Sequence, residues 1–159
     1  MIKVMFVCHG NICRSPMAEF VLKDMVKKLG VNDKFEIASS ATSREEIGND
    51  MHHGSKNKLK AEGIPFSKRS ARQFTLNDYD NYDYILLMEK YNFVNLCRII
   101  GDDDEGKVHL LLEYTGENRD IADPWYTGNF DKTYSDIVRG CRGFLQKILI
   151  KSTAQKEKP

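Results

Sequence analysis

The sequence lacks any long apolar run and carries almost no excess charge of either sign. A helix that crosses a bilayer needs about 20 consecutive apolar residues, and no stretch of the 159 residues approaches that length. Lys and Arg number 24 and Asp and Glu 23, which gives a formal net charge of +1. We therefore expect no partner bound through bulk charge, neither nucleic acid nor a membrane. We also expect no secretory signal, since the basic region, apolar stretch and cleavage site of one are missing.

Cysteine is scarce, and its spacing argues against a metal site. The four cysteines include no C-x-x-C pair of the kind found in zinc sites. They are Cys8, Cys13, Cys97 and Cys141. The adjacent His52 and His53 are interpreted as solvated loop residues rather than metal ligands. We expect neither a metal nor another cofactor. A catalytic cysteine needs a reducing compartment to persist, so the expected location is the cytoplasm.

The hydrophobic pattern alternates between strands and helices. The length suits a single domain with one sizeable core. Strands are expected at 2–7, 35–40, 84–88 and 108–112, and helices at 17–29, 54–62, 91–100 and 130–150. Strands separated by helices predict an α/β fold with a parallel, twisted sheet that binds ligands at the carboxyl ends of its strands. The domain is expected to cover 1–150, followed by a disordered polar tail at 151–159.

The segment from Cys8 to Arg14 carries the strongest functional signal. It lies between the first strand and the first helix and contains Gly10. Backbone N–H groups in such a turn, together with the helix dipole, form a cradle for anions and stabilise a thiolate. Arg14 offers a planar fork of donors to two phosphoryl oxygens. The pattern predicts a phosphate-binding loop that hydrolyses phosphate esters through a phosphocysteine. A buried structural cysteine beside a surface arginine is the alternative.

Further motifs follow this loop along nearly the whole chain. The set is Cys8-His9-Gly10-Asn11-Ile12-Cys13-Arg14-Ser15-Pro16, Ser40-Ala41-Thr42-Ser43, Gly48-Asn49, Ala71-Arg72-Gln73, Tyr84-Ile85-Leu86-Leu87-Met88 and Asp123-Pro124-Trp125-Tyr126. On these motifs the sequence resembles the low-molecular-weight protein tyrosine phosphatases. The resemblance implies a four-stranded parallel sheet with helices on both faces. It also implies a hydrolase that acts on phosphotyrosine-containing proteins and on aryl phosphates.

The resemblance assigns catalytic roles to three residues. Cys8 would attack phosphorus in line and form the covalent intermediate. Arg14 and the backbone amides of residues 9–14 would hold the equatorial oxygens in the transition state. Asp123 would act as general acid and then as general base, because a tyrosine leaving group departs as a phenolate unless it is protonated. An ordinary Asp-Pro turn is the alternative for Asp123.

The other loop residues are assigned to phosphate binding: His9, Gly10, Asn11, Ile12, Cys13 and Ser15. Ser15 is expected to donate its hydroxyl to the Cys8 thiolate. A helix N-cap is the alternative interpretation, and both roles can hold, because only the direction of the hydroxyl differs. Asn11 is expected in a left-handed conformation that pins the loop. In the family, a second loop cysteine such as Cys13 forms a disulfide with the nucleophile under oxidation; a buried apolar cysteine is the alternative. His9 is expected on the rim of the pocket.

Two aromatic residues and one carboxylate are assigned to the walls of the substrate pocket. Trp125 and Tyr126 are expected to form a wall against which a substrate ring packs, and the alternative is an aromatic pair that packs inward. The opposite wall departs from the family, because Glu45 stands where many relatives carry an aromatic residue. A charge at this position would weaken ring stacking and favour basic or non-aromatic substrates.

Three other functions compete with this interpretation. A protein-arginine phosphatase of the same fold would carry a threonine in place of Ile12, although Glu45 favours it. A thiol-coupled arsenate reductase would need two further cysteines close together, whereas Cys97 and Cys141 are far apart. A catalytically silent phosphotyrosine-binding module would normally lack the nucleophile or the acid. We expect a monomer or weak self-association, with phosphotyrosine-containing protein substrates as partners.

Overall fold

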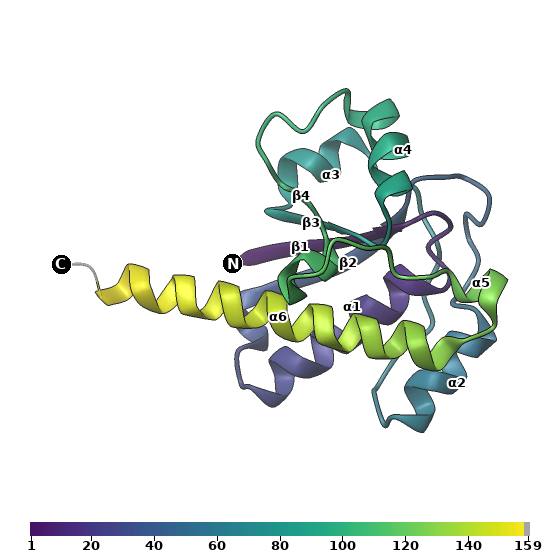
Figure 1. Ribbon diagram of the computed structural model, residues 1–159, viewed down its shortest axis with the longest axis horizontal. Helices are drawn as coiled ribbons and strands as arrows, with labels where there is room; N and C mark the ends of the chain where they lie inside the picture. The colour runs from purple at the N-terminus through teal and green to yellow at the C-terminus, as the bar shows by residue number, and fades with distance from the viewer. Residues whose placement is uncertain (158–159) are drawn as a thin grey trace.

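A four-stranded parallel sheet forms the centre of the protein (Figure 1). The structure is a computed structural model that describes the backbone of residues 1–157 and the side chains of residues 1–151. Within this part of the chain the strands are β1 (Ile2–Cys8), β2 (Phe35–Ala41), β3 (Tyr84–Leu87) and β4 (Val108–Leu110). Their order is β2-β1-β3-β4, and every pairing is parallel. The predicted sheet is confirmed.

β1 lies inside the sheet because its sequence is apolar on both faces. Residues Val4 to Val7 are each 0% exposed, as expected for a strand covered on both sides. β1 pairs with β2 along its whole length and with β3 from Val4 to Val7. The chain leaves β1 for β2 on one side and later places β3 on the other. The carboxyl end of β1 is therefore a topological switch point, where open α/β sheets bind ligands.

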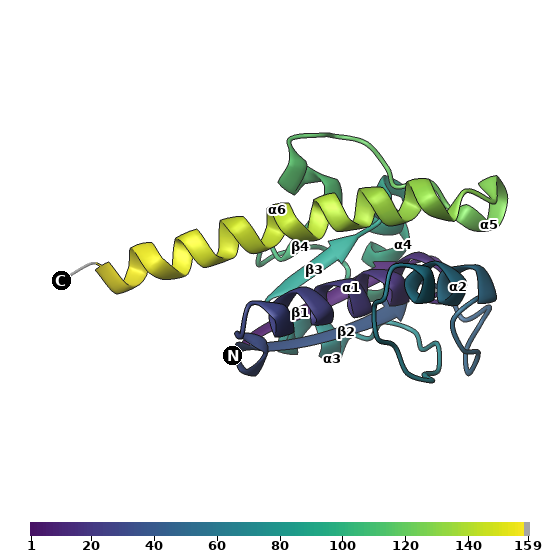
Figure 2. The same cartoon turned by 90° about the horizontal axis from the view of Figure 1, so that it is seen from below.

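Helices cover both faces of the sheet (Figure 1 and Figure 2). One face carries α1 (Arg14–Lys28), α2 (His53–Ala61) and α6 (Phe130–Glu157), and the other carries α3 (Leu76–Asn81) and α4 (Lys90–Ile100). Alternate side chains of β1 feed the two apolar clusters, with Val4 and Phe6 in one and Met5 and Val7 in the other. The expected placement of helices on both faces is confirmed.

The structure corrects several element boundaries. α1 begins at Arg14, earlier than the pattern predicts, and Pro16 lies in its first turn, where proline is tolerated because its missing N–H has no helical acceptor. β4 ends at Leu110, and the next residues turn into a 3-10 helix. The pattern does not predict the short elements, which are η1 (Asn32–Lys34), η2 (Leu111–Thr115), α3 and α5 (Pro124–Thr127). Elements of one or two turns are too short to show a clear hydrophobic period.

α6 is longer than the sequence pattern predicts. It continues to Glu157, so the expectation of a disordered tail is wrong for 151–157, and residues 158–159 lie outside the described residues. The segment 151–157 contains no glycine or proline, and its Ala, Gln, Lys and Glu residues are good helix formers. Adding residues to an existing helix is far easier than starting one, so the helix extends through this polar segment.

Two glycines of α6 allow η2 to pack directly against the helix. A Cβ at Gly143 would lie 2.3 Å from the carbonyl oxygen of Tyr114, and a Cβ at Gly140 would lie 2.5 Å from Leu111 Cγ. The contact at Gly143 is to backbone, which cannot rotate away as a side chain can. The low helix propensity of glycine is thus accepted where close packing requires it. This packing fixes the start of the segment that leads from β4 toward the site.

Gly143→Ala should destabilise the protein, because η2 or α6 must shift to admit the methyl group. We expect the free energy of unfolding to fall by about 1–3 kcal/mol, even though alanine is the better helix former. Urea denaturation measures this change. Gln146→Ala, at an exposed position of the same helix, is the matched control. Equal stability of wild type and Gly143→Ala would show that η2 does not pack this closely on α6.

Candidate active site

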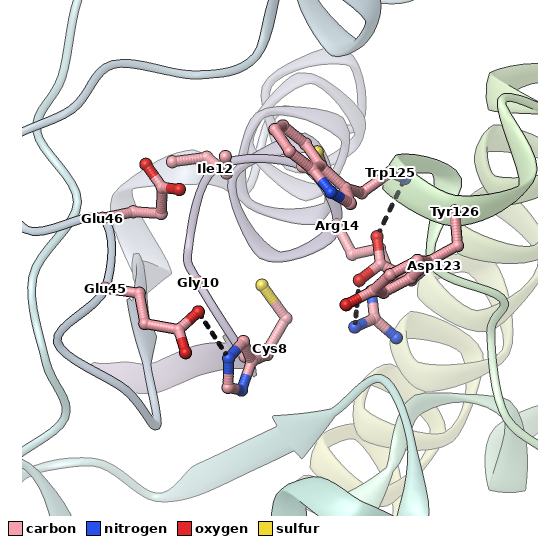
Figure 3. A pocket seen from close by; sticks show the side chains of 11 residues that line it. Cys8, Gly10, Ile12, Arg14, Glu45, Glu46, Asp123, Trp125 and Tyr126 are labelled. Carbon is pink, nitrogen blue, oxygen red and sulfur yellow. Dashed lines mark hydrogen bonds and ion pairs between the residues drawn. The ribbon is translucent and has the colours of Figure 1, made fainter.

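Cys8 ends β1, and its sulfur faces a pocket at the switch point (Figure 3). The residue is 3% exposed. The backbone N–H of Asn11 donates to Cys8 Sγ at 3.2 Å, and Ser15 Oγ lies 3.1 Å from the same sulfur. The hydroxyl is therefore placed as expected for a donor to a thiolate. Because the N-cap of α1 is Cys13 and not Ser15, the N-cap alternative for Ser15 is wrong.

Asn11 holds the loop in shape from behind the sulfur. Its φ is 60°, and it is the only described non-glycine residue with positive φ, so the expected left-handed conformation is confirmed. Its side-chain N–H group donates to Ser15 Oγ at 2.7 Å and to Ser39 Oγ at 3.0 Å. Its side-chain oxygen accepts from the Arg69 guanidinium and from the Arg72 backbone N–H. The side chain thus joins the loop to the end of β2 and to the segment around residue 70.

The Arg14 side chain is buried beside the pocket and remains charged. It is only 2% exposed. Nη1 donates to Ile121 O at 2.9 Å, and Nη2 contacts Glu89 Oε1 at 3.0 Å and Asp123 Oδ2 at 3.4 Å. Burial opposes the charge, but the Cys8 sulfur and the Glu89 carboxylate outweigh it and raise the pKa of Arg14. A charged guanidinium therefore lies where it can bind the oxygens of a phosphoryl group.

Asp123 reaches the pocket from a different part of the chain. It caps α5, with Oδ1 accepting the Trp125 backbone N–H at 3.0 Å, while Oδ2 faces Arg14. The Asp-Pro turn and the position over the loop are both present, so these two interpretations of Asp123 do not exclude each other. The carboxylate, the guanidinium and the Cys8 sulfur meet in one pocket.

Two contacts tie the segment before Asp123 to the rest of the fold. The Arg119 guanidinium binds both carboxylate oxygens of Asp136 on α6, at 2.9 and 3.0 Å, and the Asp136 side chain is 1% exposed. The backbone N–H of Ile121 donates to Met88 O at 2.8 Å. The segment is thus anchored to α6 and to the end of β3, which limits how far Asp123 can move.

The pocket has an aromatic wall and an acidic wall (Figure 3). Trp125 and Tyr126 are 58% and 84% exposed, so the inward-packed alternative for this pair is wrong. Glu45 and Glu46 lie across the pocket from them. His9 Nε2 lies 2.9 Å from Glu45 Oε2, and both side chains are solvent-accessible, which confirms the expected rim position of His9. An aromatic ring in the pocket could therefore pack on Trp125, while the carboxylates line the opposite wall.

Cys13 differs from Cys8 in its surroundings. It lies beside the pocket and is 5% exposed, and it carries no disulfide. Burial, with the negative charges of Cys8 and Asp123, raises the pKa of Cys13 to about 12. Cys13 is therefore held as a thiol at neutral pH, which makes it a poor nucleophile.

The structure brings nearly all the predicted site residues together. The pocket, of about 150 Å³, is lined by Cys8, His9, Gly10, Ile12, Cys13, Arg14, Glu45, Asp123, Trp125 and Tyr126, and also by Glu46. Asn11 and Ser15 are fully buried behind the loop and act through their hydrogen bonds. Among the described residues, no group of three or more His, Cys, Asp or Glu side chains could hold a metal. In the same part of the chain, no helix has both the length and the apolar character that spanning a membrane requires.

Sequence reasoning missed three residues that shape the site. Glu89, which binds Arg14, follows the end of β3, and the switch-point rule could have singled it out because β3 neighbours β1. Glu46 lines the pocket beside Glu45. Arg69 reaches Asn11 from 58 residues away along the chain, and no local signal marks such a contact.

The site sits on an architecture typical of α/β proteins that bind phosphoryl groups. A strand, a tight loop and a helix N-terminus meet at a switch point, where the Asn11 backbone N–H donates to the Cys8 sulfur and the buried Arg14 guanidinium lines the same pocket.

Comparison with known proteins identifies the family. The model of the low molecular weight phosphotyrosine protein phosphatase family matches residues 3–156. The Bacillus subtilis low molecular weight protein-tyrosine-phosphatase YfkJ is 39% identical over 160 residues, covering 99% of each chain. The human low molecular weight phosphotyrosine protein phosphatase is 39% identical over 149 residues, covering 91% of this chain and 94% of the relative. The chain belongs to the low molecular weight phosphotyrosine protein phosphatase family.

Solved structures agree in fold. The crystal structure of YfkJ from Bacillus subtilis aligns with a TM-score of 0.90, covering 100% of this chain and 98% of the other. The structure of DARP, a drosophila arginine phosphatase, aligns with a TM-score of 0.84 at 30% identity, covering 92% of this chain and 98% of the other. The same fold thus carries proteins named for two different phosphorylated side chains.

Thiol labelling should separate the loop cysteines. We expect iodoacetate at pH 7.5 to modify Cys8 first and to leave Cys13 and Cys141 unmodified in the native protein, because burial raises the pKa of both of these thiols. Peptide mapping by mass spectrometry reads the sites, and inorganic phosphate should protect Cys8. Faster labelling of Cys13 than of Cys8 would contradict the assigned environments.

Proposed function

We propose that the protein hydrolyses phosphotyrosine in proteins, and other aryl phosphates, through a phosphocysteine intermediate. The observation that carries the proposal is the meeting of Cys8, Arg14 and Asp123 in one pocket at the end of β1. Each supplies a different requirement of phosphoryl transfer, namely a nucleophile, a clamp for the equatorial oxygens and a proton donor. Membership of the phosphatase family supports the same reaction.

In the first step, the Cys8 thiolate attacks phosphorus. The S–P bond forms as the P–O bond to the tyrosine ring breaks, and Asp123 gives its proton to the departing phenolate oxygen. The Arg14 guanidinium and the loop N–H groups bind the equatorial oxygens, on which charge must be stabilised. Because the Arg14 side chain is 2% exposed, its hydrogen bonds are protected from competition with water.

In the second step, water replaces the thiolate on phosphorus. Asp123 accepts a proton from the water, the new P–O bond forms, the S–P bond breaks and inorganic phosphate leaves. Cys8 is now the leaving group, and the donors around its sulfur favour its departure as a thiolate. These donors are the Asn11 backbone N–H at 3.2 Å and the Ser15 hydroxyl at 3.1 Å.

The shape of the pocket supports an aryl phosphate substrate. Cys8 is 3% exposed, so the phosphorylated side chain must be long enough to reach it from the surface. A phosphotyrosine ring spans this depth and offers a flat face to Trp125, whereas phosphoserine has only one carbon between its backbone and the phosphate oxygen. Aromatic packing of this kind contributes about 0.5–1.5 kcal/mol beyond area burial.

Phosphoarginine is a second candidate substrate because of the acidic wall. The Glu45 and Glu46 carboxylates lie opposite Trp125 (Figure 3), and a carboxylate is a strong acceptor for guanidinium N–H groups. Ile12 argues against it, since the residue is apolar and bulky at the point where the loop meets the substrate.

Two further features belong to the proposal. Oxidation would join Cys8 and Cys13 in a reversible disulfide that protects the nucleophile, supported by their place beside one pocket as free cysteines. A cytoplasmic location is supported by the need for a reduced nucleophile.

Matched peptides test the substrate class. We expect kcat/KM for a phosphotyrosine peptide to exceed that for the phosphoserine and phosphoarginine versions of the same sequence, and Cys8→Ser to remove turnover, because an alkoxide is far harder to form than a thiolate. Phosphate release measures the rates. A preference for phosphoarginine would replace the proposed substrate by the second candidate, and turnover by Cys8→Ser would exclude the phosphocysteine mechanism.

Asp123→Asn should slow poor leaving groups more than good ones. Phenolate is a strong base and therefore a poor leaving group, so it needs the proton from Asp123. p-Nitrophenolate is a much weaker base and leaves readily without that proton. We expect kcat to fall by about 10²-fold or more for phenyl phosphate, within the usual range for general acids, and by clearly less for p-nitrophenyl phosphate. Asp104→Asn, at an exposed loop position, is the control. An equal loss for both substrates would remove Asp123 from the role of acid.

A further inference from the structure

The start of α2 is bonded to the phosphate loop. The backbone N–H of His52, the N-cap of α2, donates to Ile12 O at 2.8 Å, and the Ser55 hydroxyl donates to Cys13 O at 3.1 Å. Ser55 is 0% exposed. The N-terminus of α2 is therefore fixed relative to the cradle that holds the nucleophile.

The ring of His52 contacts two residues that follow the proposed acid in the chain, one on α5 and one at the start of α6. It stacks on Phe130, the first residue of α6, with ring centroids 5.5 Å apart and an interplanar angle of 14°. It meets Trp125 edge to face, with centroids also 5.5 Å apart and an angle of 76°. Trp125 in turn donates its backbone N–H to Asp123 Oδ1. His52 thus lies between the phosphate loop and α5, whose N-cap is the proposed acid.

Neighbouring residues hold the His52 ring in this orientation. Nδ1 accepts the Gly54 backbone N–H at 3.0 Å, which makes Nε2 the protonated nitrogen of a neutral ring. A Cβ on Gly54 would lie 2.3 Å from the Phe130 ring, so only glycine permits this approach. Burial and the adjacent His53 lower the pKa of His52, which favours the neutral form. The interpretation of His52 as a solvated loop residue is therefore wrong.

We propose that His52 is a positioning residue that couples the phosphate loop to the acid-bearing α5, setting the place of Asp123 through Trp125 and Phe130. It touches no reacting atom. Its effect rests on the proposed function, because it matters for turnover only if Asp123 protonates the leaving group. A displacement of even 1 Å in a catalytic group can cost about 10²-fold in rate. Loss of a ring that packs on this segment should therefore lower the rate measurably.

Two variants separate the ring from the cap. His52→Asn keeps a side chain that is favoured at an N-cap but removes the ring, and His52→Phe keeps a ring but removes the acceptor for Gly54. Asn57→Ala is the matched control, because Asn57 is an exposed residue of the same helix. His53 is unsuitable as a control, since its ring stacks on the His52 ring with centroids 4.2 Å apart.

The kinetic signature should be that of a misplaced acid and not of a damaged loop. We expect His52→Asn to lower kcat for phenyl phosphate by about tenfold and kcat for p-nitrophenyl phosphate by less than about twofold. Competitive inhibition by inorganic phosphate should keep its wild-type constant. His52→Phe should recover much of the lost rate, and Asn57→Ala should behave as wild type. In an Asp123→Asn background, His52→Asn should have no further effect on phenyl phosphate, because the two changes act on one group.

Equal losses for both substrates, weaker inhibition by phosphate, or full additivity with Asp123→Asn would overturn the proposal. Trp125 is the only tryptophan of the chain, so its fluorescence gives a test that does not need turnover. Quenching of Trp125 by acrylamide should increase in His52→Asn and return toward wild type in His52→Phe. Unchanged quenching in His52→Asn would overturn the coupling even if the wild type proved inactive, and an inactive wild type with altered quenching would instead refute the proposed function.

Discussion

The left-handed turn at Asn11 is the constraint on which the site depends. A φ of 60° bends the loop back so that the Asn11 N–H meets the Cys8 sulfur. Glycine would adopt this conformation more easily, but it could not make the side-chain hydrogen bonds to Ser15 and Ser39. The cost of the strained backbone is thus offset by bonds that also orient the Ser15 hydroxyl. One residue shapes the cradle and sets the donors of the nucleophile.

Charge balance around Arg14 explains why a guanidinium can be buried there. A buried charge needs partners, because the loss of its hydration is expensive. Glu89 approaches from the end of β3 and Asp123 from α5, while Ile121 offers a carbonyl oxygen. Parallel strands bring these groups to the same edge of the sheet. The arrangement holds the guanidinium rigid and directed toward the pocket, where a flexible surface arginine would lose much of its binding energy to ordering.

The parts of the site that are contiguous in sequence could be predicted, and the parts assembled by tertiary contacts could not. The loop from Cys8 to Ser15 carries its own strand, turn and helix signals, and the alternation of strands and helices gives the sheet. Arg69 and His52 act through partners that are distant in sequence, and their residue types suit many other surroundings. The helical end of α6 could not be predicted for another reason, since a polar composition shows only that a segment need not be buried, and not that it cannot be helical.

The nucleophile and the acid lie on separate segments of the fold, so their relative position depends on the contacts between those segments. The loop is fixed by β1, α1 and Asn11, whereas Asp123 lies more than a hundred residues later on a short helix with little core of its own. Its position depends on the Arg119–Asp136 pair, on the hydrogen bond from Ile121 to Met88 just after β3, and on the rings of Trp125, His52 and Phe130. Changes in these contacts can misplace the acid while the phosphate cradle stays intact. The dependence of the rate on the leaving group therefore reports on the placement of Asp123, whereas phosphate affinity reports on the loop. His52 is hydrogen-bonded to the loop and packs on the segment that carries Asp123. It can therefore change the leaving-group dependence without changing the phosphate affinity.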